Sequence, residues 1–257
     1  MKTRLSQGNP FGPNAKGFVW ERLPGSPGSV QLDFGAHDGS MLALLVQGGK
    51  VARGVGLDAN ADVVRDSRGR LPERVELHLI GKKEPIPFPD ATFEAVSAIG
   101  VLEHVHEQDR LLGEICRVVK PEGQVFIAVP GKHVFSFLDL ANWKFVFPRI
   151  HRLYYSARFG RQQYQDRYVA CRNGLIGDVE TEKAWHEHFT HHELAHLLAC
   201  NGLEVTEADG AGLLYRVIHL VVSTAAPRKF DLLERLLRWD AKAFDKGEIF
   251  VLARRKQ

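Results

Sequence analysis

The sequence contains few cysteines, little net charge and no cysteine pair at metal-binding spacing. Its three cysteines, Cys116, Cys171 and Cys200, lie far apart along 257 residues. An odd number of widely spaced cysteines argues against both a disulfide framework and a CxxC metal site, and it predicts a reducing, cytoplasmic compartment. The formal net charge is only +3, which is too small to indicate a nucleic-acid partner.

Segments that would enter or cross a membrane are missing as well. Residues 1–17 have no apolar core of the kind that signal peptides carry. No apolar run reaches the roughly 18 residues of a membrane span, and the longest candidate, residues 213–226, is interrupted by Arg216 and His219. A composition of 44% hydrophobic and 25% charged residues excludes global disorder. The length suits one large α/β domain, with or without an inserted subdomain.

The stretch from Val30 to Gly39 has the pattern of a strand, a tight turn and the start of a helix. Apolar residues alternate over 30–34, as in a strand that enters a sheet. Gly35 permits a sharp turn, and Asp38 is a candidate cap for the following helix. The apolar residues of that helix are expected to face a core: Met41, Leu42, Leu44 and Leu45. Such a turn leaves backbone N–H groups free to bind a carboxylate or phosphate.

A second short strand, Val55–Asp58, ends in an acid that lies 19 residues after Gly39. In nucleotide-binding α/β folds an acid near this offset bonds the two ribose hydroxyls. The alternative is that Asp58 only caps the helix that follows. A nicotinamide dehydrogenase is a weaker interpretation, because it needs G-x-G-x-x-G for a pyrophosphate, whereas Gly35 and Gly39 give G-x-x-x-G.

The rest of the chain continues this alternation. Further strands are predicted at 75–79, 93–99 and 124–129, and helices at 61–68 and 107–119. Strands that alternate with helices predict a parallel sheet wound in the right-handed sense, with ligands bound outside the carboxyl ends of the strands. Residues 1–29 are rich in Gly, Pro and Asn, and we expect an N-terminal arm with one amphipathic piece around 18–20.

Three blocks of this sequence match a known family in order and spacing. The first is Leu32-Asp33-Phe34-Gly35 with Gly39, and the second is Gly56-Leu57-Asp58. The third comprises Pro87–Glu94, Val101–Val105, Glu114, Arg117–Pro121 and Val129–Gly131. Together the blocks resemble the class I methyltransferases that use S-adenosylmethionine, in particular the group that acts on quinones, sugars and natural products.

The resemblance implies an α/β fold with a Rossmann-like, doubly wound, seven-stranded and mostly parallel sheet. It implies that the last strand, Glu248–Leu252, inserts antiparallel beside the fifth. The domain would run over 30–257, with residues 132–188 as a helical cap inserted after the fifth strand. Residues 132–172 hold ten aromatic residues and eight Lys or Arg against two acids, which favours a lid over the acceptor pocket or a helical cap that simply packs on the sheet.

The resemblance also assigns S-adenosylmethionine as cofactor and names its contacts. Asp33, Gly35, Ala36, His37 and Gly39 would surround the methionine end, Asp58 and Ala59 the ribose and adenine, Ile80, Gly81 and Lys82 the adenine, and Ala98 and Ile99 the pocket wall. Two positions depart from the family pattern. His37 stands where a third glycine is usual, and Lys82 stands where an acid commonly contacts the adenine amino group. Both favour the rival interpretation of a non-catalytic binding protein that keeps the fold.

Methyl transfer to a hydroxyl needs alignment and a base with a pKa near neutrality, a range that histidine covers. The candidates are His104 after the fourth strand, His133 after the fifth, and His186 and His188 before the late helix, with His133 and His188 favoured. A surface or hydrogen-bonded histidine is the alternative for each. We expect O-methylation of a small sugar, glycolipid or quinone-like acceptor, anionic or lipid-linked, with contact to a membrane surface as a further expectation.

The segment from His192 to His196 matches the zinc-protease pattern HExxH, so a zinc hydrolase is a third interpretation. The same residues form a capping box, with Thr190 as N-cap and Glu193 at the third helical position. The capping box commits the glutamate to the start of the helix, and twelve histidines in the chain make an accidental match unsurprising. We therefore expect a structural role for this segment and assign no metal.

Overall fold

The computed structural model describes residues 9–11, 14–67, 69–81, 83–133, 146–169, 187–212, 235–237, 239–240 and 247–256. The described strands are β1 (Val30–Phe34), β2 (Arg53–Asp58), β3 (Val75–Leu79), β4 (Phe93–Ile99), β5 (Val119–Pro130), β6 (Leu203–Ala211) and β7 (Glu248–Arg255). The described helices are α1 (Ala15–Arg22), α2 (Ser40–Gln47), α3 (Ala61–Ser67), the 3₁₀ turn η2 (Leu102–His104), α4 (Gln108–Val118), α6 (Pro148–Phe159), α7 (Arg161–Tyr164), the π-helical η4 (Gln165–Val169) and α8 (His191–Cys200). None of these described helices has the length and apolar content to cross a membrane.

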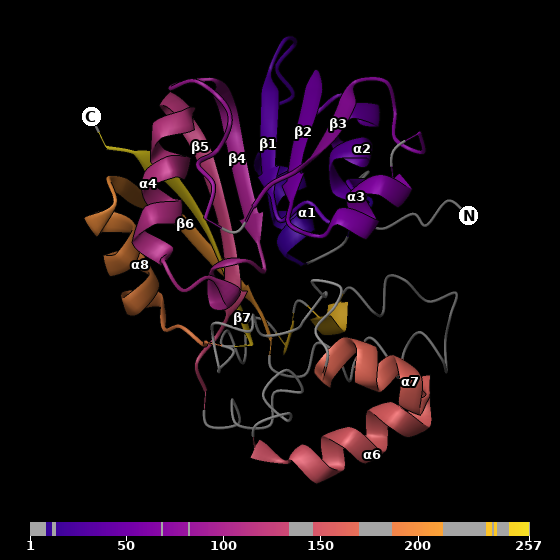
Figure 1. Ribbon diagram of the computed structural model, residues 1–257. Helices are drawn as coiled ribbons and strands as arrows, with labels where there is room; N and C mark the ends of the chain where they lie inside the picture. The colour runs from indigo at the N-terminus through magenta and orange to yellow at the C-terminus, as the bar shows by residue number, and fades with distance from the viewer. Residues whose placement is uncertain are drawn as a thin grey trace.

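The described strands form a seven-stranded sheet in the order β3-β2-β1-β4-β5-β7-β6 (Figure 1). The first five strands pair in parallel, whereas β7 runs antiparallel to both β5 and β6. The chain therefore has the predicted doubly wound, mostly parallel α/β fold, and the last strand inserts beside β5 as expected. The strand order reverses direction at β1 and β4, which is where ligands bind in open α/β sheets.

Side chains on the two faces of the sheet belong to separate hydrophobic clusters, as the period of two in a strand requires. Val96 and Ile127 pack in a cluster with residues of α4 and α8, whereas Ala95 and Phe126 pack with residues of α1 and α2. Figure 1 shows the same layers, with α4 and α8 on one face of the sheet and α1, α2 and α3 on the other. Helices on both faces explain why β4 and β5 are nearly continuous apolar runs.

Helix α1 is built from the amphipathic piece in the first 29 residues. Asn14 caps it, since its side chain accepts a hydrogen bond from the Gly17 amide at 3.0 Å. The Phe18 ring lies 6.2 Å from the ring of Phe126 and 5.9 Å from that of Phe250, measured between centroids. The helix therefore covers the middle of the sheet through aromatic packing.

Three local expectations were wrong. The N-cap of α2 is Gly39, in the left-handed region, while the Asp38 carboxylate accepts a hydrogen bond from the Ser40 amide at 3.0 Å outside the cap position. Leu44 is 37% exposed and does not face the core. The start of β5 also lies earlier than predicted, at Val119, because a β-bulge absorbs the turn residues between Val119 and Gln124 against β4.

The predicted capping box of α8 is confirmed. The Thr190 hydroxyl accepts a hydrogen bond from the Glu193 amide at 3.1 Å, and the Glu193 carboxylate accepts one from the Thr190 amide at 2.8 Å. The second carboxylate oxygen of Glu193 lies 2.9 Å from the Lys132 ammonium. The helix thus begins immediately after the chain returns to the end of β5.

Because one orphan amide of α8 depends on the Thr190 hydroxyl, we expect Thr190→Ala to lower the free energy of unfolding by about 1 kcal/mol. Thr190→Ser keeps the hydroxyl and is the matched control, and Glu193→Gln should keep most of the stability because glutamine also completes a capping box. Urea unfolding followed by circular dichroism measures all three. Equal midpoints for the Ala and Ser variants would contradict the capping role.

Candidate functional site

The loop after β1 is held against the end of β2 by backbone hydrogen bonds. The amides of Gly35 and Ala36 both donate to the Leu57 carbonyl, at 2.8 and 3.0 Å. Gly35 has φ +79°, and a Cβ added there would lie 2.5 Å from a methyl carbon of Val101. This position accepts only glycine, because a side chain would be strained in the backbone and would collide with the loop after β4.

His37 adopts the backbone conformation that a glycine would supply at this point, with φ +51°. A non-glycine residue in this backbone region lowers the free energy of unfolding by roughly 1 kcal/mol. The fold tolerates His37 there despite this loss of stability. The His37 side chain is 43% exposed, and its Nδ1 atom lies 3.6 Å from a carboxylate oxygen of Asp38. The His37 side chain therefore does not prevent the left-handed backbone conformation at this point of the loop.

The Asp58 carboxylate joins the two loops of the site. One oxygen accepts a hydrogen bond from the His37 amide at 2.7 Å, and the other accepts one from the Asn60 amide at 2.8 Å. The cap of α3 is Asn60, whose side-chain oxygen accepts from the Asp62 and Val63 amides at 3.1 and 3.2 Å. Asp58 is therefore not the cap of α3. Its oxygens are fixed in direction and keep further lone pairs for a ligand hydroxyl.

Asp33 is a buried acid beside the glycine turn. The Ser97 hydroxyl donates to it at 2.7 Å, and the Gln31 side-chain amide donates to that hydroxyl at 2.8 Å. Burial raises the pKa of the Asp33 carboxyl to about 7, although the Ser97 hydrogen bond and the charge of Lys16 lower it. A buried carboxyl at a ligand-binding edge suits a positively charged ligand, whose charge would favour the ionised form.

The expected adenine wall lies at the ends of β3 and β4. The Ile80 amide donates to the Asp58 carbonyl at 3.0 Å, so the two segments are adjacent. Ile80 and Ala98 are buried, Ile99 is half-buried, and Ala59 and Gly81 are exposed. Lys82 lies outside the described residues. The candidate cofactor residues within the described part of the chain therefore gather on β1, β2, β3 and β4 at their carboxyl ends.

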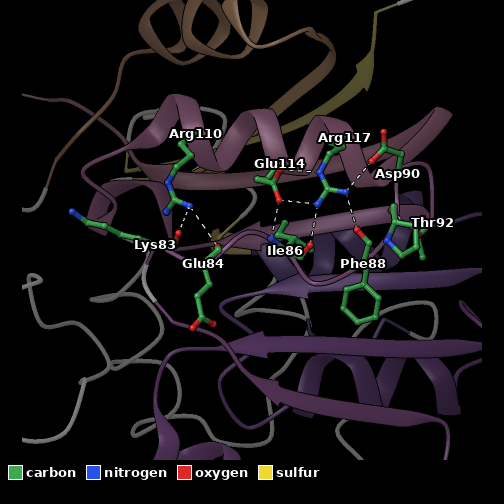
Figure 2. Close-up of polar contacts among 10 residues, drawn as sticks. Lys83, Glu84, Ile86, Phe88, Asp90, Thr92, Arg110, Glu114 and Arg117 are labelled. Atoms are coloured by element: carbon green, nitrogen blue, oxygen red, sulfur yellow. Dashed lines mark hydrogen bonds and ion pairs between the residues drawn. The ribbon is translucent and has the colours of Figure 1, made fainter.

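Helix α4 fastens the proline-rich segment that follows this wall (Figure 2). The Arg117 guanidinium donates to the carbonyls of Ile86 and Phe88 at 2.9 and 2.8 Å and pairs with Glu114 and Asp90. The hydrogen bonds to Glu114 and then to Asp90 raise the pKa of Arg117 above its ordinary value. Prolines in the segment cannot join a strand ladder, so side chains of α4 satisfy the backbone instead.

The histidine candidates lie on segments that the structure brings together. The Phe189 amide donates to the Pro130 carbonyl at 3.0 Å, and the Lys132 amide donates to the Phe189 carbonyl at 2.7 Å. His133 and His188 therefore flank one short parallel bridge at the end of β5. His104 closes the turn η2 after β4, where the Glu187 amide approaches the Glu103 carbonyl at 3.5 Å. His186 lies outside the described residues.

The HExxH segment has no free glutamate base. The Thr190 backbone amide and the Lys132 ammonium lower the pKa of Glu193 to about 2, so this carboxylate is ionised and hydrogen-bonded at neutral pH. The rings of His192 and His196 stack with centroids 6.5 Å apart on the exposed side of α8. Among the described residues, no three His, Cys, Asp or Glu side chains gather closely enough to hold a metal ion.

Comparison with known proteins decides the family. The model of the methyltransferase domain family matches residues 32–127. The ubiquinone/menaquinone biosynthesis C-methyltransferase UbiE of Burkholderia mallei is 30% identical over 175 residues, which make up 67% of this chain and 71% of that protein. The chain belongs to the class I S-adenosylmethionine-dependent methyltransferases. The three sequence blocks thus identified the family correctly.

Other relatives match over shorter stretches. UbiE of Hydrogenovibrio crunogenus is 35% identical over 106 residues, 39% of this chain and 42% of that protein. The chain spans less than half the length of this relative and of two other curated relatives that it matches. A solved complex between the Haloferax volcanii Trm112 methyltransferase activator and a methyltransferase superposes with a TM-score of 0.61 at 17% identity, over 93% of this chain and 88% of that one, which is a likeness of fold.

Sequence reasoning missed two residues of the site, Ser97 and Gln31. Both are fully buried, and together they form the hydrogen-bonded chain that ends on Asp33. A faint signal was present, because Ser97 interrupts an apolar strand. Only the parallel pairing of β1 with β4, which sets Asp33 opposite Ser97, shows which group the serine serves.

The raised pKa of Asp33 predicts a pH dependence of stability. An unfolded chain has this carboxyl near 3.8, whereas the folded chain holds its proton up to about 7, so the stability from this proton is present at low pH and is lost as pH rises toward 7. Asp33→Asn removes the effect. From pH 5 to pH 8, the free energy of unfolding of the Asn variant should rise by about 2–3 kcal/mol relative to that of the unmodified protein.

Urea unfolding at the two pH values tests this expectation. Asp66→Asn, a change at an exposed acid on α3, is the matched control and should follow the unmodified protein. If Asp33→Asn shows the same change with pH as the unmodified protein, the Asp33 carboxyl is already ionised at pH 5.

Proposed function

We propose that this chain transfers a methyl group from S-adenosylmethionine to a hydroxylated ring of a small acceptor of the quinone, sugar or glycolipid class, most simply by O-methylation. The observation that carries the proposal is the pair of acids at the ends of the neighbouring strands β1 and β2. Asp33 is buried beside the glycine turn, and Asp58 is aimed by two backbone amides.

These residues fit the proposed cofactor chemically. When bound, S-adenosylmethionine supplies an electrophilic methyl group on a sulfonium. The Asp33 carboxylate offers a buried negative charge for the cationic methionine end, and the Asp58 carboxylate offers lone pairs to the ribose hydroxyls. The Gly35 turn keeps side chains away from the loop between them. Resemblance to the family assigns these two roles to the two acids, and the residues present support the assignment.

The acceptor site is proposed at the end of β5, where the chain leaves the sheet and later returns. His133 and His188 flank the Gly131–Phe189 bridge, which supports either imidazole as the group that takes a proton from an acceptor hydroxyl. Removal of that proton from a phenol spreads negative charge over the oxygen and the ring carbons beside it. The same base therefore supports transfer to oxygen or to carbon, and similarity to the UbiE C-methyltransferases of ubiquinone and menaquinone biosynthesis favours a quinone-like ring.

If Asp58 holds the ribose, Asp58→Ala should weaken binding of S-adenosylmethionine by about thirtyfold or more. The reason is the loss of two charge-assisted hydrogen bonds in a partly dry site, worth roughly 2–4 kcal/mol. Isothermal titration calorimetry measures the dissociation constant, and Asp62→Ala on α3 is the control. An unchanged constant would remove Asp58 from the site. Absence of any cofactor binding by the unmodified protein would instead favour the non-catalytic binding protein.

If a histidine is the base, its removal should lower turnover by roughly 10²–10⁴ and spare cofactor affinity, because the cofactor contacts lie on other strands. His133→Ala and His188→Ala are assayed separately for methyl transfer and for S-adenosylmethionine binding, using a panel of hydroxylated quinones and sugars. His192→Ala, on the exposed side of α8, is the control. Near-normal turnover by both variants would exclude His133 and His188 and move the search to His104 and His186.

A further inference from the structure

Helix α6 presents an apolar stripe that faces away from its own packing partners. The Ile150, Leu153 and Tyr154 residues are 53%, 74% and 49% exposed, and Ala157 is exposed on the next turn. Positions i, i+3, i+4 and i+7 lie on one side of a helix. The four residues therefore form a continuous strip, which we call the α6 stripe.

One flank of α6 is already packed. His151 is buried, and its ring lies 4.4, 5.7 and 4.7 Å from the rings of Tyr155, Tyr164 and Tyr168, measured between centroids. This aromatic cluster joins α6 to α7 and η4. The helix consequently has a fixed inner face, and the α6 stripe is left over after that packing is complete.

Arginines border the stripe on both sides. Successive residues of a helix are about 100° apart around its axis. The stripe therefore covers roughly 100° of the helix circumference, with Arg149 at one border and Arg158 at the other. Arg152, on the far side of α6, and Arg161, in α7, are exposed as well, and residues 146–165 contain no acid. Within the described ranges, no carboxylate pairs with any of these four guanidinium groups. Their charge is therefore available to an external anion.

The position of α6 shows on which side of the protein this surface lies. Helices α6 and α7 lie together at one end of the molecule, beyond the carboxyl ends of the parallel strands (Figure 1). The candidate base residues and both acids of the cofactor site lie at those same strand ends. A surface docked on α6 would therefore lie on the acceptor side of the protein.

We propose that the outer face of α6 docks on an anionic lipid membrane, with the α6 stripe inserted at the interface and the flanking arginines bound to lipid phosphates. A flat interface fits an apolar strip with cations along both borders of a helix that lies in the membrane plane. The twelve-residue helix is about 18 Å long, enough for several headgroups. Docking involves no residue of the cofactor site, so it does not depend on the methyl-transfer proposal.

Vesicle co-sedimentation of the full chain tests the proposal. Vesicles of phosphatidylcholine mixed with phosphatidylglycerol should bind the protein, and vesicles of phosphatidylcholine alone should bind it far less. Ile150→Ser with Leu153→Ser should weaken binding by about tenfold, and Arg149→Gln with Arg158→Gln by about 25-fold, given roughly fivefold for each arginine. Added salt should weaken binding of the unmodified protein.

Two control variants match these changes in chemistry. Leu44→Ser alters an exposed leucine on α2, and Arg65→Gln alters an exposed arginine on α3 that is paired with Asp62 and Asp66. Both should bind the anionic vesicles as the unmodified protein does. Thermal unfolding and S-adenosylmethionine titration of every variant show that the fold and cofactor site remain intact, which separates failure of docking from failure of the proposed function.

Three results would overturn the proposal. The first is absence of binding to anionic vesicles by the unmodified, folded protein. The second is equal binding to neutral and anionic vesicles that the α6 variants leave unchanged. The third is self-association in sedimentation velocity that the Ile150→Ser with Leu153→Ser variant abolishes, which would assign the α6 stripe to a second copy of this chain.

Discussion

The parallel pairing of β1 between β2 and β4 is the constraint on which the rest of the site depends. This register sets Asp33 opposite Gly56 on one side and opposite Ser97 on the other. It also brings the loop after β1 close enough to β2 for the His37 amide to reach Asp58. A strand order that separated β1 from β2 would move Asp33 away from Asp58.

The site concentrates unfavourable contributions to folding at a few positions. Asp33 loses its hydration on folding and accepts one hydrogen bond from the Ser97 hydroxyl. As a result of burial, its pKa rises to about 7. His37 adopts a backbone conformation that most residues avoid. Such features persist only where the surrounding structure is stable enough to hold them. Here the surroundings are two hydrophobic clusters on opposite faces of the sheet, with helices covering both.

The described segment after β3 and the two ends of the connection after β5 are held by different means. Side chains of α4 hold the proline-rich segment after β3, with Arg117 and Glu114 bonding its carbonyls and an amide. After β5 the chain returns through a backbone bridge between Gly131 and Phe189, and α8 begins with its capping box directly afterwards. The ligand edge of the sheet is therefore assembled from loops whose backbone groups are satisfied outside the sheet ladder.

The sequence by itself determined the family, the alternation of strands and helices, the two acids at strand ends and the capping box at Thr190. These features are local: apolar periodicity, a glycine turn and side-chain-to-backbone caps act within a few residues of one another. Local patterns did not show that Gly39 rather than Asp38 is the cap of α2. Nor did they show that Asn60 rather than Asp58 is the cap of α3. Each choice depends on backbone angles and on a contact across strands. Only the tertiary structure decided that Ser97 donates to Asp33, that His133 and His188 flank one bridge, and that the apolar stripe of α6 is exposed. Those outcomes are set by pairings between residues distant in the chain, which no local pattern encodes.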